Sequence, residues 1–188
     1  NKNKENLTKE KIDKKQYQCV ETLNELEKII KSCDNEKLIS IDTETTSIHP
    51  LEANLIGISL SIGKNKSYYI PLRHSKGKNL PFSESLKKLK YLIEDNSIKK
   101  VGQNIKYDFI VLKKYGITIN PYEDTMLVSY TLDAGLNRHN LDSLSEIHLG
   151  HKTISYKDIT GTGKNKINFA DVSLKEATKY AAEDADVT

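Results

Sequence analysis

LISIDTE, residues 38–44, is an apolar strand pattern that ends in two acids. Side chains of a strand alternate between the two faces of its sheet, so Asp42 and Glu44 point to the same side. Two carboxylates on one face favour a bound cation, but an Asp-x-Glu at a strand end is most often only solvated charge. The pair therefore needs partners elsewhere in the chain before it indicates chemistry.

The sequence around this strand predicts an α/β domain, because strand patterns dominate the first half and helix patterns the second. Thr22 and Glu25 form a capping box that opens a helix ending near Lys31. Gly63-Lys64-Asn65 is typical of a hairpin turn between two strands. The other strands are expected at residues 54–62, 66–71, 98–104 and just after Pro121, and the other helices at 83–93, 105–115, 125–132, 140–150 and from 174 onward.

Three further polar residues lie on predicted helices. Asp108 falls in the first turn of one helix, within GQNIKYD. Tyr180 and Asp184, in YAAED, are four residues apart and so share one helical face. Taken singly, an exposed helical Asp is more often solubilising, and a Tyr one turn before it more often packs against the core. Only the order of these residues along the chain, together with Asp42 and Glu44, indicates a functional site.

IDTET, QNIKYD and YAAEDAD, in this order and spacing, closely resemble the three motifs of the DEDD superfamily of proofreading 3'-5' exonucleases. Tyr180 stands four residues before Asp184, and Lys179 stands where the other subgroup has His, so the chain resembles the DEDDy subgroup. EDTMLVSYTLD, RHNLDSLSEIHLGHKTISYKDITGTGK and YAAEDADVT further resemble the proofreading domain of bacterial DNA polymerase I, of family A. The likeness runs from about Tyr17 to Thr188.

This resemblance implies a ribonuclease H-like fold: a five-stranded mixed sheet with its second strand antiparallel and helices on both sides. It implies two divalent metal ions, Mg²⁺ or Mn²⁺, which suit a site of oxygen ligands. One ion is expected on Asp42, Glu44 and Asp184. Asp42 is expected to bridge to the second ion, Asp108 to anchor its water shell, and Tyr180 to orient the attacking water.

The resemblance also implies contacts with a single-stranded 3' end. Gln103 and Asn104 are expected on phosphates or sugars, and Arg138 on the scissile phosphate. Tyr107 and Tyr156 are expected to press on the last nucleotides, and Ile48 to wedge between bases. The alternative is core packing for Ile48, Tyr107 and Tyr156, and helix capping for Gln103 and Asn104.

The function implied is removal of 3'-terminal nucleotides from single-stranded or frayed DNA, as proofreading for a DNA polymerase I. Two alternatives stay open: an inactive scaffold domain of the polymerase, and an RNA-trimming exonuclease resembling RNase D. Because the chain stops at Thr188, inside a predicted helix, it is expected to be a fragment with a polymerase domain downstream.

The composition indicates where the domain begins and which classes of protein are excluded, but it does not identify a chemical activity. The first sixteen residues, mostly Lys, Asn and Glu, predict a flexible linker before a domain at 17–188. The net charge of +3 permits a polyanionic partner without requiring one. Cys19 and Cys33 are expected to be reduced, and no stretch is long and apolar enough for a membrane, so we expect a cytoplasmic protein.

Overall fold

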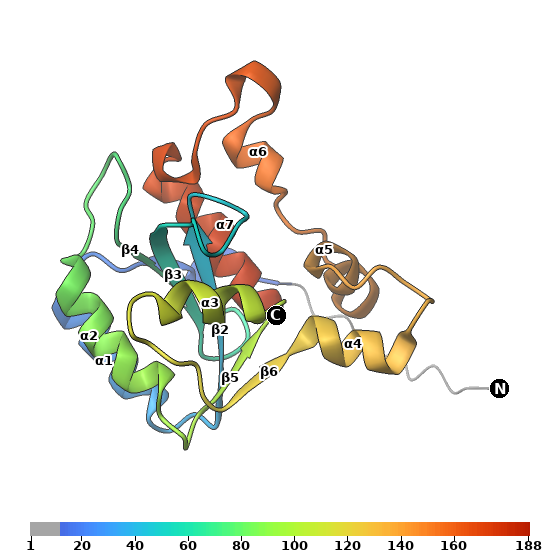
Figure 1. Cartoon of the computed structure of the whole chain (residues 1–188), viewed down its shortest axis with the longest axis horizontal. Helices are drawn as coiled ribbons and strands as arrows, with labels where there is room; N and C mark the ends of the chain where they lie inside the picture. Colours follow the sequence, from blue (N-terminus) through green and yellow to red (C-terminus); the bar gives the residue numbers. More distant parts are fainter. Residues whose placement is uncertain (1–11) are drawn as a thin grey trace.

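The computed structural model describes residues 12–188, built around one six-stranded mixed sheet in the order β1-β4-β3-β2-β5-β6 (Figure 1). Strand β3 runs antiparallel to both of its neighbours, and the remaining pairs are parallel. The strands are β1 (Gln18–Cys19), β2 (Leu38–Thr45), β3 (Leu55–Ser61), β4 (Ser67–Pro71), β5 (Lys99–Gly102) and β6 (Tyr122–Asp124). The expected mixed sheet with its antiparallel second strand is confirmed.

The expected count of five strands is wrong, because β1 adds a sixth strand at the edge of the sheet. Gln18 and Cys19 pair in parallel with Tyr68 and Tyr69 of β4, and the Val20 amide donates to the Tyr69 carbonyl at 2.8 Å. A two-residue strand is too short to leave an alternating pattern in the sequence. Only its partner strand reveals it.

Helices cover both faces of the sheet (Figure 1). They are α1 (Leu23–Cys33), α2 (Phe82–Ile93), α3 (Lys106–Lys113), α4 (Thr125–Asp133), α5 (Leu141–Leu144), α6 (Tyr156–Thr160) and α7 (Leu174–Val187). The helix expected between Asn140 and Gly150 is α5 followed by a π-helical turn, Ser145–Leu149. Helix α6 has no counterpart among the expected elements. Within residues 12–188, every helix falls short of the length and apolarity that a bilayer crossing requires.

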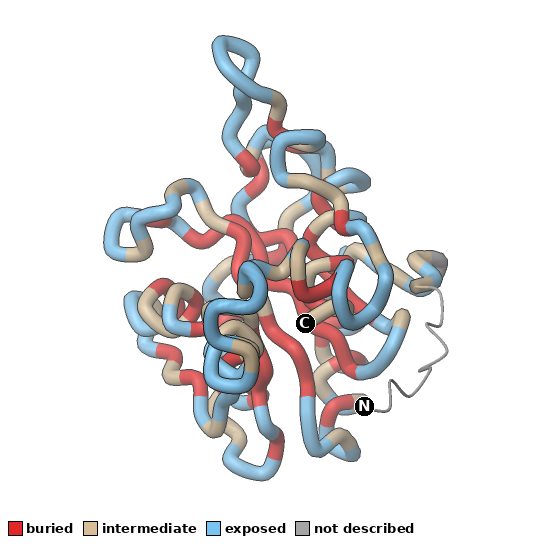
Figure 2. Tube along the Cα trace, turned by 90° about the vertical axis from the view of Figure 1, so that its right-hand side faces the viewer, coloured by how far each residue is buried: buried red, intermediate tan, exposed pale blue. Residues whose placement is uncertain are grey.

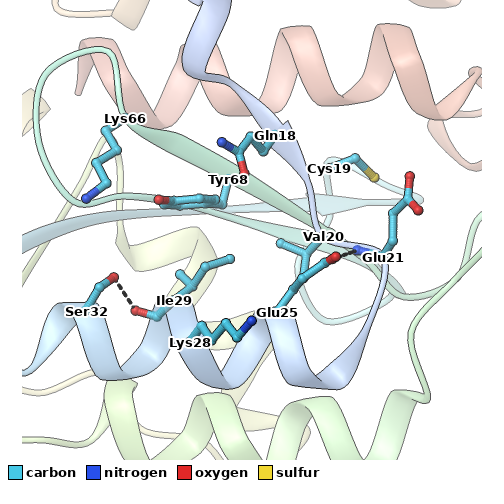
Figure 3. Close-up of a pocket in the computed structure, with 10 residues that line it drawn as sticks. All are labelled: Gln18, Cys19, Val20, Glu21, Glu25, Lys28, Ile29, Ser32, Lys66 and Tyr68. Atoms are coloured by element: carbon cyan, nitrogen blue, oxygen red, sulfur yellow. Dashed lines mark hydrogen bonds between the residues drawn. The ribbon is translucent and has the colours of Figure 1, made fainter.

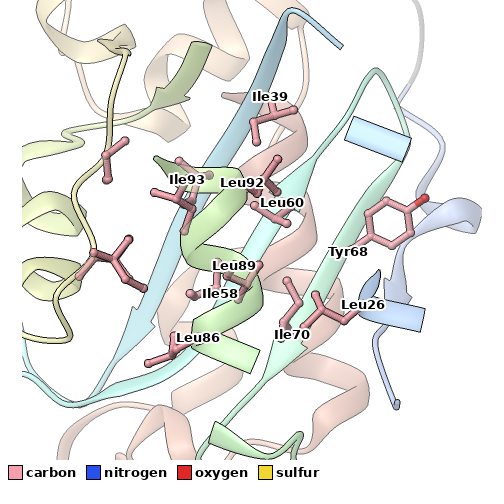
Figure 4. Close-up of a cluster of buried hydrophobic side chains, with 14 of the residues drawn as sticks. Leu26, Ile39, Ile58, Leu60, Tyr68, Ile70, Leu86, Leu89, Leu92 and Ile93 are labelled. Carbon is pink, nitrogen blue, oxygen red and sulfur yellow. The ribbon is translucent and has the colours of Figure 1, made fainter. Parts of the chain in front are cut away.

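The larger hydrophobic core lies between the sheet and helices α1, α2 and α3. Alternate residues of the central strands supply its floor, and Figure 4 shows the leucines of α2 and Ile93 lying over them. Members fully shielded from solvent include Leu26, Ile39, Ile41, Ile58, Leu60, Ile70 and Leu89. Burying each such side chain stabilises the fold by about 1.5–3 kcal/mol, so this face fixes the sheet to its helices.

The opposite face of the sheet carries small residues and receives α7. Residues paired across antiparallel strands share a face, so Gly57 and Ser59 lie on the same side as their partners Glu44 and Asp42. Helix α7 packs on this side through its buried alanines, Ala177, Ala181 and Ala185. Small side chains on both surfaces allow a close approach. Figure 2 shows the buried segments running through the centre of the molecule.

The described chain makes contacts ahead of Tyr17, the expected start of the domain. Lys14–Gln16 form a short 3-10 helix, the Asp13 amide donates to Asn65 Oδ1 at 2.7 Å, and Lys14 pairs with Glu183. Residues 1–11 of the predicted linker lie outside the described residues. The prediction of a flexible linker at 1–16 therefore stays a prediction.

Candidate active site

Three carboxylates meet where α7 crosses the end of β2. Asp42 and Glu44 come from β2 and Asp184 from α7, and one oxygen of each lies within 4.8 Å of the others. Glu44 is buried, and Asp42 and Asp184 are half-buried. The strand period places the first two on one face, and the alanine side of α7 brings Asp184 down to them.

Burial makes the charged forms of these acids unfavourable. It raises the pKa of Asp42 to about 7 and the pKa values of Glu44 and Asp184 well above their usual range. The charge of Asp42 raises the pKa of both other acids further. Two unit charges about 4 Å apart repel by about 4 kcal/mol at an effective dielectric of 20. The cluster is therefore costly unless a cation neutralises it.

The donor set fits a hard divalent cation. Glu44 Oε1 is buried and has no hydrogen-bond partner among the described residues, so this oxygen has an unmet need for a donor or an ion. Carboxylate oxygens are the ligands that Mg²⁺ and Mn²⁺ prefer. The residues present thus satisfy the chemistry of such a site.

Asp108 approaches the three acids from α3. It is 2% exposed, and its Oδ1 accepts hydrogen bonds from the Thr43 amide at 3.0 Å and the Thr43 hydroxyl at 2.5 Å. Burial raises the pKa of Asp108, and the nearby charge of Asp42 raises it further. The structure therefore brings Asp108 to the cluster but outside the tightest group of three.

Tyr180 lies one helical turn before Asp184, as its spacing predicts. Burial raises the pKa of its phenol, and its hydrogen bond with Asp184 favours the carboxylate of that residue. The ring of Tyr180 packs against Phe169, with centroids 6.0 Å apart, and against Tyr156, at 5.9 Å. Tyr180 therefore stays protonated at neutral pH and forms part of an aromatic wall.

A cleft of about 730 Å³ opens beside the acids. Four of the six residues predicted to bind substrate line it: Ile48, Asn104, Tyr107 and Tyr156. Ile48 is 85% exposed, which disfavours the core-packing alternative for this side chain. The Tyr107 hydroxyl bonds to the Thr45 hydroxyl and the Ser47 carbonyl, so Tyr107 also fixes the loop that follows β2.

The other two predicted substrate residues do not line this cleft. The Gln103 amide donates to the His139 carbonyl at 2.7 Å and accepts from the Thr125 hydroxyl at 2.6 Å. Arg138 is exposed in the loop between α4 and α5. Their substrate contacts stay predictions.

The sequence reasoning missed Lys166, Asn168 and Glu183. Lys166 and Asn168 line the cleft on the side of Tyr156, and Lys166 Nζ lies 6.0 Å from the Tyr156 ring centroid. Glu183 is buried next to Asp184. The basic run KNK at 164–166 was the one available signal for Lys166, but it does not show which lysine faces the cleft.

A second groove, of about 580 Å³, lies between α1 and the β1–β4 edge (Figure 3). It contains none of the predicted site residues. Cys19 lines it, and burial raises the pKa of that thiol, so the thiolate is scarce at neutral pH. Both cysteines, Cys19 and Cys33, are free, in agreement with the expected reduced state.

Comparison with known proteins places these features in a family. A family model described as 3'-5' exonuclease matches residues 17–188. The DNA polymerase I of Rhizobium leguminosarum is 42% identical over 197 residues, covering 94% of this chain and 19% of that protein. The chain thus spans about a fifth of the length of the curated relatives that it matches.

Solved structures show the same fold at low identity. Escherichia coli RNase D matches with a TM-score of 0.70 at 20% identity, covering 91% of this chain and 42% of that one. Brucella melitensis NrnC with bound Mg²⁺ matches with a TM-score of 0.62 at 24% identity, covering 81% and 68%. The expected ribonuclease H-like fold is thereby confirmed.

Proposed function

Because the chain belongs to the 3'-5' exonuclease family of DNA polymerase I, we propose that it removes nucleotides one at a time from a DNA 3' end. The observation that carries this proposal is the convergence of Asp42, Glu44 and Asp184 within 4.8 Å, beside a cleft lined with aromatic side chains. Hydrolysis of a phosphodiester needs an activated water and neutralisation of the phosphate charge.

Two divalent ions are the proposed cofactors. Asp42, Glu44 and Asp184 would hold one. Asp42 would also bridge to the other, whose water shell Asp108 would anchor. When bound, such ions lower the pKa of the attacking water and neutralise charge on the phosphate and the leaving 3' oxygen. A solved relative in fold carries Mg²⁺, which supports this assignment.

The side chains of the chain itself then orient the reactants. Tyr180, whose phenol keeps its proton at neutral pH, orients the attacking water through a hydrogen bond accepted by its hydroxyl oxygen. Ile48, Tyr107 and Tyr156 offer apolar and aromatic surface to the unpaired terminal bases. Because an unpaired terminus reaches such a cleft more easily than a paired one, frayed or mismatched ends are the favoured substrates.

We further propose that this activity serves as proofreading within a longer polymerase. The matched relatives are DNA polymerases I of about five times this length. A single-stranded DNA 3' end and a polymerase domain in the same chain are accordingly the proposed partners.

The test is incubation with 5'-labelled single-stranded DNA or RNA of matched sequence, in Mg²⁺ or Mn²⁺. We expect a ladder of shortened DNA products, abolished by EDTA and reduced by at least about 10²-fold in Asp42→Asn. Asp34→Asn changes an exposed Asp beyond the end of α1 and serves as the matched control, with wild-type activity expected.

Each other outcome has a meaning. A folded wild type that cleaves neither substrate while Mg²⁺ is bound favours the inactive scaffold. Cleavage of RNA as fast as DNA favours an RNA-trimming enzyme. Equal activity in Asp42→Asn and Asp34→Asn contradicts the assignment of the acids.

A further inference from the structure

Glu183 is a buried acid that the proposed chemistry does not use. Its side chain is fully shielded, yet it directly precedes Asp184 on α7. Both of its oxygens are occupied: Oε1 pairs with Lys14 and accepts from His151 Nε2 at 2.7 Å, and Oε2 accepts from the Ile154 amide at 2.6 Å. Glu183 lies outside the group of three carboxylates that could share an ion, and its oxygens bind these donors instead.

These contacts fasten three distant segments to one side chain. Lys14 belongs to the first described turn of the chain, His151 follows the π-helical turn, and Ile154 lies just before α6. Hydrogen bonds to a charged carboxylate are shorter and stronger than neutral ones. Glu183 is therefore the anchor that holds residues 151–154 against α7.

The anchored segment leads straight into the cleft wall. Ser155 caps α6 and Tyr156 is its first residue, only two positions after Ile154. The Tyr156 ring then stacks on Phe169 at 6.2 Å and meets Tyr180 edge-on at 5.9 Å. A shift of Ile154 would thus displace the ring on which a terminal base is proposed to lie.

We propose that Glu183 is a positioning residue: by fixing residues 151–154 to α7, its carboxylate sets Tyr156 in the substrate cleft. The inference rests on the proposed exonuclease function, and it assigns substrate binding, rather than metal binding or bond cleavage, to the network of Glu183, His151 and Lys14. Loss of the Glu183 carboxylate should therefore weaken oligonucleotide binding, and it should do so only when the Tyr156 ring is present.

The test compares Glu183→Gln with Glu176→Gln, the same change on the same helix, where Glu176 is exposed and bonds to Ser173. We measure kcat and KM on a single-stranded oligonucleotide, its Kd by fluorescence anisotropy, and the Mg²⁺ midpoint by thermal melting. For Glu183→Gln we expect KM and Kd to rise about five- to tenfold, with kcat within about twofold and an unchanged Mg²⁺ midpoint. Glu176→Gln should match the wild type.

A double variant separates positioning from a general structural role. Tyr156→Ala alone should weaken binding, and adding Glu183→Gln to it should change Kd by less than about twofold, because the ring to be positioned is gone. A full additional loss in the double variant overturns the proposal. So does a shifted Mg²⁺ midpoint, or a Glu183→Gln protein with wild-type Kd.

Two further results are accounted for in advance. If Glu183→Gln fails to fold, His151→Gln removes one anchoring contact and is judged by the same comparison with Tyr156→Ala. If the wild type cleaves nothing, the proposed function fails, while the anisotropy measurements still decide whether Glu183 acts through Tyr156.

Discussion

Asp42 links metal binding to folding at the level of a single residue. Burial raises its pKa from 3.8 to about 7. An acid whose pKa is raised in the folded state supports stability fully below its unfolded pKa, and that support is lost as pH rises through the folded pKa. The metal-free chain should therefore lose stability between about pH 4 and 7, and bound Mg²⁺ should restore it.

Thermal melts from pH 5 to 8, in EDTA and in saturating Mg²⁺, check this prediction. The difference between the melting temperatures in Mg²⁺ and in EDTA should increase from pH 5 to pH 8 by about 2–4 °C or more. A change of ~1 kcal/mol in the free energy of unfolding causes a shift of this size in a chain of this length. In Asp42→Asn the curve in EDTA should be flatter. A gap that is the same at pH 5 and pH 8 would contradict the linkage.

At the same scale, the strand and helix periods alone predicted the shared faces of the site residues. Period two placed Asp42 with Glu44, and the i, i+4 spacing placed Tyr180 with Asp184. No such rule identified Glu183 as an anchor. Glu183 directly precedes Asp184 on α7 but bonds to residues far away in sequence, which a local period cannot predict. Residue type predicted the chemistry, and tertiary contacts decided which acids were available for it.

Among the elements, Gly57 of β3 leaves room for the side chain of Tyr69 from the neighbouring strand β4. A Cβ added at Gly57 would lie 2.2 Å from the hydroxyl of Tyr69, which is buried and bonds to His74 at 2.7 Å. Gly57→Ala should therefore lower the free energy of unfolding by about 1–3 kcal/mol, as overpacking does. Urea denaturation measures this loss.

Ser59 is the matched control on the same face of the same strand. Its hydroxyl is buried without a partner among the described residues, so Ser59→Ala removes an unsatisfied polar group and should be neutral or stabilising. Equal losses in the two variants would show that the whole strand resists substitution, and that the Gly57–Tyr69 contact is not special.

Elements with strong local signals were predicted well, and short ones were not. The capping box at Thr22 and Glu25 marked the start of α1, which ends at Cys33 rather than near Lys31. Helix α6 has five residues and β1 has two, so neither shows a period. Their stability comes from packing and from partners such as Glu183 and β4, which a local pattern cannot contain.

Across the whole molecule, the two ends of the described chain are joined beside the site. The Tyr17 hydroxyl donates to Asp186 at 2.7 Å, and Lys14 pairs with Glu183. Residues 14–17 are therefore attached to α7 at the residue before Asp184 and at the second residue after it. Composition predicted this first segment only as a charged linker. The composition of this segment could not predict its contacts with Glu183 and Asp186.

Charge at this scale also sets how the chain should bind DNA. The first sixteen residues carry six Lys against three acids, so residues 17–188 sum to zero and offer no general attraction for a polyanion. Affinity must then depend on where single cations lie. Lys166 lines the cleft over Tyr156, whereas Lys164 is exposed in the same loop and does not line it.

Lys166→Gln should therefore remove one phosphate contact, and Lys164→Gln should not. Binding to single-stranded DNA is measured in the Asp42→Asn background, at constant Mg²⁺ and increasing KCl. For Lys166→Gln, the slope of log K against log salt should become shallower by about 0.7, the value for one released counterion on a single strand. Because both variants lose one charge from one loop, identical slopes would mean that only overall charge matters, and the assignment of Lys166 to a phosphate would fall.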